Sequence, residues 1–254
     1  MSKPKVGFFD FTSCEGCQIE LTNYGDSAFL ALLDLIDIVE FREAMTETAG
    51  NLDIAFIEGS FSREEDRKRL ESIRKRSAVV IAYGACAATG GINALKNHQP
   101  DYAKYVYGDK SNMPHLASQD AVPISAAIKV DYFVHGCPMD RNELLRIVSD
   151  ILHGSKPVIP DYPVCVECKR RETVCRYLQG DHCMGVVARA GCNAICPAHG
   201  IPCEACRGFV THANEESLKK TMVVRGGLTF DRAANKSRMF TATFRNEGNG
   251  SENL

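Results

Sequence analysis

Twelve cysteines in a chain of 254 residues are the side chains best suited to chemistry here. The first 155 residues contain four of them, namely Cys14, Cys17, Cys86 and Cys137. The other eight fall between Cys165 and Cys206. Thiolates bind zinc and iron–sulfur clusters, and a lone C-x-x-C pair can also be a redox dithiol or half of a zinc site.

The first four cysteines follow runs that predict buried strands. Apolar runs predict strands at residues 5–9, 37–41, 52–57, 78–83 and 130–134, and helical spacing predicts helices at 18–35, 63–75 and 141–153. Strands that alternate with helices indicate βαβ units, so we expect an α/β fold with a doubly wound parallel sheet. The polar stretch at 92–123 is expected to form a loop with short helices.

Three strand-to-helix connections carry these cysteines. Cys14 and Cys17 follow the first strand in the run Thr-Ser-Cys-Glu-Gly-Cys. Cys86 follows the fourth strand in Gly-Ala-Cys-Ala-Ala-Thr-Gly-Gly, and Cys137 follows the fifth in His-Gly-Cys-Pro. Ligand sites in open α/β sheets lie outside the carboxyl ends of the strands. We therefore expect the four thiols to converge on one cofactor.

Glycines surround this set of thiols, at Gly16, Gly84, Gly90, Gly91 and Gly136. Glycine lets the backbone approach closely, so that amide N–H groups can point at cluster sulfurs. Zinc needs no such space, so the glycines favour a 4Fe–4S cluster. A phosphate cradle is another interpretation of a glycine-rich turn, but this turn lacks a P-loop lysine and dinucleotide-fingerprint spacing.

Four motifs in order resemble one known family. Cys-Glu-Gly-Cys, Glu-Gly-Ser, Gly-Ala-Cys-Ala-Ala-Thr-Gly-Gly and His-Gly-Cys-Pro are similar to the N-terminal domain of nickel–iron hydrogenase small subunits, over residues 4–155. The resemblance implies a flavodoxin-like domain in which Cys14, Cys17, Cys86 and Cys137 hold the proximal 4Fe–4S cluster, facing the catalytic subunit. Glu58, in Glu-Gly-Ser, is expected to be either a carboxylate that handles protons near the cluster or a structural residue.

The eight later cysteines form two spaced runs. The first is Cys165-x2-Cys168-x6-Cys175-x7-Cys183, and the second is Cys192-x3-Cys196-x6-Cys203-x2-Cys206. Eight thiols match two further 4Fe–4S clusters. The C-x-x-C pairs and the step from Cys196 to Pro197 are typical of ferredoxin-like cluster binding. Structural zinc knuckles are the alternative, because spacing alone does not separate zinc from iron.

Pairing within the eight stays open. We expect the first run to hold the distal cluster and the second the medial cluster, but ferredoxins exchange one ligand between neighbouring clusters, which leaves a swapped set possible. Well-known periplasmic members of the family have a histidine ligand at the outermost cluster and three cysteines at the middle one. This chain offers a full eight, as soluble cytoplasmic members do. His182, beside Cys183, is the candidate to replace a thiol, although the surplus of cysteines makes this unnecessary.

The composition of the chain predicts three segments. We expect a flavodoxin-like domain at 1–157, a small ferredoxin-like domain organised by its clusters at 158–213, and a C-terminal extension at 214–254 with a disordered end. Three further features have plain interpretations. The charged run at 63–76 predicts a solvated helix face with i,i+4 pairs, and His135 a packed histidine. Lys169, Arg170 and Arg171 are expected to offset cluster charge, to dock a partner or to be ordinary surface residues.

Bulk properties narrow the class of protein. Hydrophobic residues make up 44% and charged residues 24%, as in globular proteins, and the net charge of −2 argues against a nucleic-acid binder. No apolar run approaches the ~18 residues that span a bilayer, so we expect no membrane insertion. The N-terminal residues lack a secretory pattern and a twin-arginine pair, which predicts a cytoplasmic chain, where disulfides are rare. Metal or cluster ligation then explains the cysteines.

The resemblance implies an electron relay within a hydrogenase. The chain lacks the paired motifs of the large subunit near both termini, so the nickel–iron centre is expected in that separate subunit. Electrons would pass through three 4Fe–4S clusters to flavin- or iron–sulfur-bearing subunits that use NAD(P), a deazaflavin or ferredoxin. One alternative is the cluster subunit of complex I or of a membrane-bound hydrogenase, whose first motif has adjacent cysteines, unlike Cys14-Glu-Gly-Cys17. The other is a zinc-stabilised interaction module without a redox role.

Overall fold

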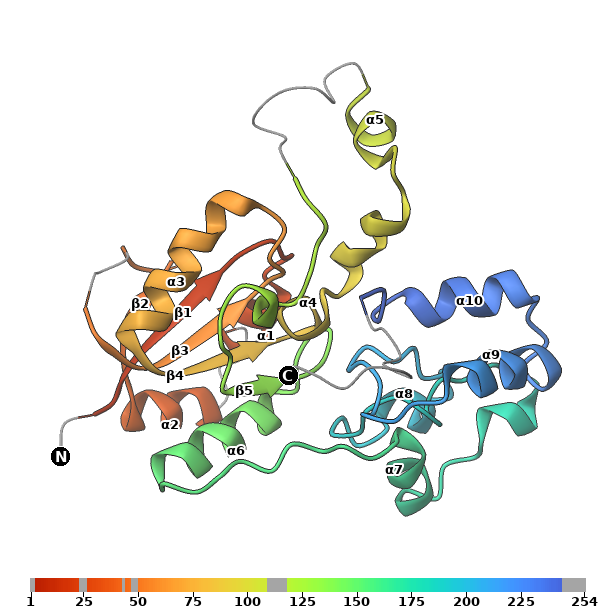
Figure 1. The fold of residues 1–254 in the computed structure, drawn as a ribbon. Helices are drawn as coiled ribbons and strands as arrows, with labels where there is room; N and C mark the ends of the chain where they lie inside the picture. The colour runs from red at the N-terminus through yellow and green to blue at the C-terminus, as the bar shows by residue number, and fades with distance from the viewer. Residues whose placement is uncertain (1–2, 23–26, 43, 47–49, 109–117, 244–254) are drawn as a thin grey trace. The chain divides into compact units, whose positions relative to one another are not determined.

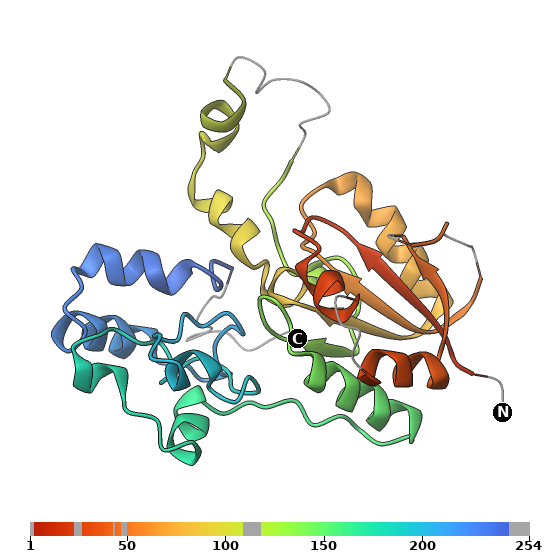
Figure 2. The same cartoon turned by 180° about the vertical axis from the view of Figure 1, so that it is seen from behind.

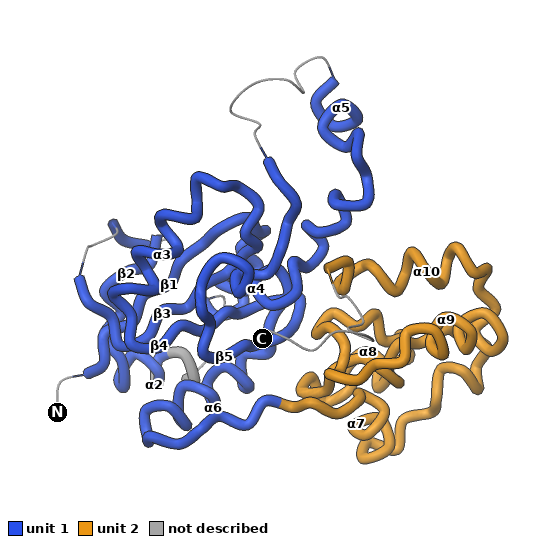
Figure 3. Tube along the Cα trace, viewed as in Figure 1, with its two compact units in different colours: residues 1–159 blue, residues 160–254 orange. Residues whose placement is uncertain are grey.

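The structure is a computed structural model that describes residues 3–22, 27–42, 44–46, 50–108 and 118–243. The chain divides into two compact units, Met1–Ile159 and Pro160–Leu254 (Figure 3). Each unit is described by itself below. Within the described ranges, no helix is long and apolar enough to cross a membrane.

Unit 1 is built on a parallel sheet with the strand order β2-β1-β3-β4-β5 (Figure 1). The strands are β1 (Lys5–Asp10), β2 (Asp37–Phe41), β3 (Leu52–Glu58), β4 (Ser77–Tyr83) and β5 (Tyr132–Val134). This order is the doubly wound arrangement of flavodoxin-like folds. The predicted α/β fold class is therefore confirmed, and the switch point lies between β1 and β3.

Helices of unit 1 connect the strands. They are α1 (Gly16–Thr22), α2 (Ser27–Leu35), α3 (Arg67–Arg76), α4 (Ala85–Thr89), α5 (Tyr102–Tyr107) and α6 (Arg141–Leu152), with short 3-10 turns η1 (Glu64–Asp66), η2 (Ile92–His98) and η5 (Ile124–Ala126). The predicted helix at 18–35 is two helices, and residues 23–26 between them lie outside the described residues. Asp140 caps α6, since its carboxylate accepts the Glu143 N–H at 2.9 Å.

Both faces of the sheet are covered by helices (Figures 1 and 2). One face packs Phe8, Phe56 and Tyr83 against apolar residues of α1, α2 and α6. The opposite face packs against Leu70 and Ile73 of α3. Because successive strand residues point to opposite faces, a sheet covered on both sides needs nearly continuous apolar strands, as this sequence provides.

The charged run at 63–76 is more than the predicted solvated face. Helix α3 ends with Arg76, whose two Nη atoms donate to the carboxylate of Glu40 at 2.6 and 2.7 Å. Glu40 is fully buried in β2. This fork-to-fork pair fastens the last turn of α3 to the edge of the sheet.

Unit 2 consists of short helices and irregular backbone around the eight later cysteines. Its elements are α7 (Val164–Arg170), η6 (Arg176–Gln179), α8 (Ile195–Ala198), α9 (Glu215–Val224) and α10 (Phe230–Arg238). Two isolated bridges, Pro163 with Arg189 and Ala188 with Phe209, are among its backbone pairings. A small apolar cluster includes the thiols of Cys183 and Cys203.

Helices α9 and α10 pack within this second unit. Leu218 and Met222 of α9 and Ala233 of α10 are buried in the apolar cluster of unit 2. A Cβ placed on Gly226, in the turn between the two helices, would lie 2.7 Å from the Cα of His182. The turn therefore packs directly on the cysteine segment. The predicted disordered end lies mostly outside the described residues.

Candidate cluster sites

The first four cysteines lie on connections at the carboxyl edge of the sheet. Cys14 and Cys17 follow β1, Cys86 lies in α4 after β4, and Cys137 follows β5. Two backbone bonds tie the last two connections together: Gly84 N–H donates to Val134 O at 2.8 Å, and Ala85 N–H donates to Gly136 O at 2.6 Å. The parallel strands thus bring thiols that are far apart in sequence to one edge.

Glycines make room for the sulfurs at this edge. Gly84 has φ +85°, and a Cβ there would lie 2.5 Å from the Sγ of Cys17. Gly91 has φ +57°, and its Cβ would lie 2.9 Å from the Sγ of Cys86. Both positions favour glycine for their backbone conformation and for the space that a side chain would fill. We call this site, in which Gly84 and Gly91 leave space beside the sulfurs of Cys17 and Cys86, the cradle.

The thiols of this set influence one another electrostatically. Burial raises the pKa of Cys86 to about 12, and the charges of Cys137 and Cys14 add to the effect. Burial also raises the pKa of Cys17, followed by the carboxylate of Glu58 and the charges of Cys137 and Cys86. Four clustered thiolates need positive charge among them, and bound metal ions deprotonate thiols and supply that charge. The donor set therefore fits an iron–sulfur cluster.

Glu58 holds the first cysteine loop in place through hydrogen bonds to its backbone. It is the last residue of β3 and only 2% exposed. Its Oε1 accepts the N–H of Cys17 and its Oε2 accepts the N–H of Gln18, both at 3.1 Å. Burial raises the pKa of Glu58, while these two bonds act in the opposite direction. The carboxylate fixes the start of α1 and with it the backbone of Cys17.

Two polar side chains also help to shape this edge. The sequence did not single out Asn93, whose Nδ2 donates to Thr12 O at 2.6 Å and to the Oγ of Ser60 at 3.2 Å. Asn93 therefore joins the Glu-Gly-Ser connection to the loop that leads to Cys14. Its sequence signal is its place after the glycine pair of the Cys86 motif. His135 stacks on Phe133, with ring centroids 6.1 Å apart, as a packed histidine does.

In unit 2 the first run of cysteines gathers around Cys165. Burial, followed by the charges of Cys183, Cys168 and Cys175, raises the pKa of Cys165 to about 11, and Lys169 opposes the shift. A Cβ on Gly185 would lie 3.5 Å from the Sγ of Cys183 and 3.7 Å from that of Cys165. The sulfurs of Cys183 and Cys165 therefore lie beside the same glycine.

In the second run, Cys192 and Cys206 are among the residues whose charges act most on Cys203, but Cys196 is not. Burial raises the pKa of Cys203 well above the ordinary value, and Cys183, Cys206 and Cys192 add to the shift. The N–H of Cys203 donates to the Sγ of Cys183 at 3.3 Å, so the two runs meet at this pair. Cys196 is exposed in α8.

Partners are found for three side chains near these runs, those of Arg170, Arg171 and His182. The guanidinium of Arg170 lies 5.9 Å from the ring centroid of Tyr162, and Arg171 donates to Asn193 O at 2.8 Å. The Nε2 of His182 lies 3.3 Å from the Oε1 of Glu204, which also accepts from Lys236 at 2.5 Å. Among the described residues, no three His, Cys, Asp or Glu side chains form a group suited to a single metal ion.

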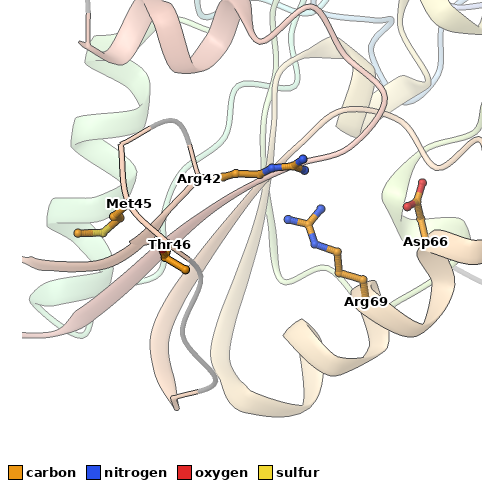
Figure 4. A pocket seen from close by; sticks show the side chains of 5 residues that line it. All are labelled: Arg42, Met45, Thr46, Asp66 and Arg69. Carbon is orange, nitrogen blue, oxygen red and sulfur yellow. The ribbon is translucent and has the colours of Figure 1, made fainter.

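One open pocket of unit 1 contains no cysteine. It is lined by Arg42, Met45, Thr46, Asp66 and Arg69 (Figure 4). The guanidinium groups of Arg42 and Arg69 point toward each other, and both contact Asp10: Arg42 reaches its carboxylate at 3.2 Å and Arg69 its carbonyl at 2.7 Å. These contacts with Asp10, the last residue of β1, explain why the two guanidinium groups lie close together.

The chain is similar in sequence to known hydrogenase subunits. Residues 14–151 match the family model described as "NADH ubiquinone oxidoreductase, 20 Kd subunit". The chain is 35% identical over 206 residues to sulfhydrogenase 2 subunit delta of Pyrococcus furiosus, covering 80% of this chain and 86% of that protein. It is 33% identical over 235 residues to a subunit of the F420-non-reducing hydrogenase vhu of Methanocaldococcus jannaschii, covering 80% and 81% of the two chains.

A solved structure extends the comparison to three dimensions. A chain of an NAD+-reducing nickel–iron hydrogenase in the H2-reduced state superposes with a TM-score of 0.54 and 26% identity, over 63% of this chain and 96% of that one. The family model covers more than half of the present chain. The chain therefore belongs to the family of the NADH ubiquinone oxidoreductase 20 kDa subunit, in which the relatives named above are hydrogenase subunits.

Proposed function

We propose that this chain is the electron-relay small subunit of a nickel–iron hydrogenase. It carries electrons between the nickel–iron centre of a separate large subunit and a further redox partner. Support comes from the hydrogenase names of its relatives and from the solved nickel–iron hydrogenase that shares its fold. The observation that carries the proposal is the cradle at the sheet edge, where glycines leave space for the sulfurs of Cys17 and Cys86.

Three 4Fe–4S clusters are assigned to the twelve thiols. The proximal cluster is held by Cys14, Cys17, Cys86 and Cys137. The distal cluster takes Cys165, Cys168, Cys175 and Cys183, and the medial cluster takes Cys192, Cys196, Cys203 and Cys206. The mutual influence of the four first-run thiols supports this pairing. The proximity of Cys203 to Cys183 keeps an exchange of one ligand as an outcome of the tests below.

The residues of this chain hold and tune the clusters. A 4Fe–4S cluster supplies one-electron chemistry, with a potential set by hydrogen bonds to its sulfurs, burial and charge. The backbone N–H of Cys203 donates to the Sγ of Cys183 at 3.3 Å. An N–H donor to a ligand sulfur stabilises the reduced form of a cluster, which carries more negative charge than the oxidised form.

The exposure of the first site fits transfer between subunits. Cys14 and Cys137 are exposed, whereas Cys17 is buried, so the proximal cluster would lie against the surface. That surface is where we place the large subunit. The further partner is a flavin- or iron–sulfur-bearing subunit linked to NAD(P), a deazaflavin or ferredoxin. Twelve thiolate ligands suit a reducing compartment, so we place the complex in the cytoplasm.

Metal analysis of the complex purified without oxygen tests this function. We expect about twelve iron and twelve sulfide ions per chain, with paramagnetic resonance signals after reduction. A chain with two or three zinc ions and no sulfide would instead be a zinc-stabilised module. A chain that copurifies with no nickel-containing subunit would remove the hydrogenase assignment even if its clusters are present.

A further inference from the structure

The loop that carries Cys192 has an unusual backbone. Gly191 has φ +115°, Asn193 φ +54° and Ala194 φ +47°. Glycine and asparagine adopt the left-handed region readily, but it is unfavourable for Ala194, which has a Cβ and no polar side chain. Such a conformation persists only where surrounding contacts hold it in place. The loop therefore depends on another element of unit 2.

Helix α7 supplies these contacts. The Oε1 of Glu167 accepts the N–H of Gly191 at 2.8 Å, and its Oε2 accepts the N–H of Ala194 at 3.0 Å. Oε2 also lies 3.9 Å from the Sγ of Cys192. Glu167 is 7% exposed, so these bonds are shielded from water. One turn further along the chain, Arg171 donates to the carbonyl of Asn193 at 2.8 Å.

Glu167 itself lies in the first cysteine run, between Cys165 and Cys168. We propose that Glu167 is a positioning residue for the other run: through the N–H groups on either side of Cys192 it fixes the Cys192 thiol. The two cluster sites of unit 2 are thereby mechanically linked. This inference rests on the proposed function, because it requires that Cys192 is a cluster ligand.

The same device occurs in unit 1. Glu58 accepts two consecutive N–H groups, one of them from Cys17, and is likewise buried. In both units a buried glutamate from a different element of the chain holds the backbone at a cysteine. Glu167 differs in that it comes from a segment that carries thiols of its own.

The charge of Glu167 adds an electrostatic role. The Oε2 of this carboxylate lies 3.9 Å from the Sγ of Cys192, the proposed ligand atom. A nearby negative charge opposes the addition of an electron to a cluster, so it lowers the reduction potential. Removal of the charge should shift the cluster that Cys192 binds to a more positive potential.

Glu167→Gln in the complete complex tests the proposal. A glutamine oxygen can accept one N–H, but its NH2 group then faces the other N–H, so one backbone donor loses its partner. A redox titration monitored by electron paramagnetic resonance resolves the signals of the individual clusters. Separate Cys192→Ser and Cys165→Ser variants identify which signal belongs to each run.

We expect Glu167→Gln to alter the signal that Cys192→Ser alters, either by a positive potential shift or by loss of about a third of the iron. The matched control is Glu172→Gln, an exposed glutamate of the same segment, which should leave all signals unchanged. Arg171→Gln leaves the carboxylate of Glu167 in place and removes only the hydrogen bond to the carbonyl of Asn193. It should therefore disturb the same signal less than Glu167→Gln does.

Two results would overturn the inference. A change confined to the signal identified by Cys165→Ser would show that Glu167 acts within its own run. An unchanged spectrum in both Glu167→Gln and Arg171→Gln would show that the loop holds its shape without α7. A wild-type complex that contains no iron at all refutes the proposed function itself, which distinguishes that failure from the other two.

Discussion

The carboxylate of Glu58 accepts the backbone N–H of Cys17 at 3.1 Å, across 41 positions of the chain. This bond and its companion to Gln18 attach the end of β3 to the start of α1. Because Glu58 is buried, the two donors have no water to replace it. The position of the Cys17 thiol thus depends on a residue from an adjacent strand.

Glu58→Ala should therefore affect stability and the proximal cluster together. We expect the free energy of unfolding to fall by about 1–3 kcal/mol per unsatisfied donor. The signal of the cluster bound by Cys17 should broaden or disappear, while the two clusters of unit 2 keep theirs. Thermal unfolding and low-temperature paramagnetic resonance measure the two effects. An intact proximal signal would mean that Glu58 is only a packing residue.

Gly84→Ala should displace a ligand. The new Cβ would lie 2.5 Å from the Sγ of Cys17, and the thiol can yield only by rotating out of its position. We expect loss of about four of twelve iron ions, measured by metal analysis. Gly154→Ala is the matched control, because Gly154 also has a positive φ but has nothing within 4 Å of its Cβ. It should cost about 1 kcal/mol of backbone strain and keep all the iron. Equal iron in both variants would contradict the cradle.

Gly226→Ala should loosen the turn between α9 and α10 from the cysteine segment. Its Cβ would meet the Cα of His182 at 2.7 Å, so backbone must move against backbone. We expect a loss of about 1–3 kcal/mol, as for other overpacked sites, and faster proteolysis after residue 214. The neighbouring Gly227→Ala has open space around its Cβ and should leave the cluster signals unchanged. Identical proteolysis of the two variants would argue against this contact.

Arg76→Gln should destabilise unit 1 without changing any cluster. It removes the Arg76 guanidinium from the fully buried carboxylate of Glu40, and breaking such a buried pair typically costs about 3–5 kcal/mol. The double variant with Glu40→Gln removes the charge and should recover much of that loss, as a double-mutant cycle in chemical denaturation can measure. No recovery would show that the pair contributes through packing alone.

The sequence was informative wherever local patterns decide the structure. Apolar runs separated by helical spacing identified all five strands of the sheet. Because parallel strands have their carboxyl ends at one edge of the sheet, the sequence then predicted which thiols of unit 1 lie at that edge. Regular cysteine spacing outlined two further sets. The four motifs around Cys14, Glu58, Cys86 and Cys137 led to the family that the comparisons confirm.

Other features had no local signal. The charged run at 63–76 gave no indication that Arg76 would pair with a buried glutamate of β2. Nor did the polar tail indicate that Leu218, Met222 and Ala233 would complete the apolar cluster of unit 2. In the sequence, Glu167 is simply a charged residue between Cys165 and Cys168. Its hydrogen bonds with the Cys192 loop appear only in three dimensions.

The sequence by itself determined the order of strands and thiols along the chain, because side-chain periodicity and cysteine spacing are local properties. The tertiary structure alone decided which carboxylate holds which cysteine. Glu58 with Cys17 and Glu167 with Ala194 are 41 and 27 residues apart, and such pairs form only when packing brings their elements together. Burial then makes those bonds costly to lose, since water cannot substitute for the missing partner.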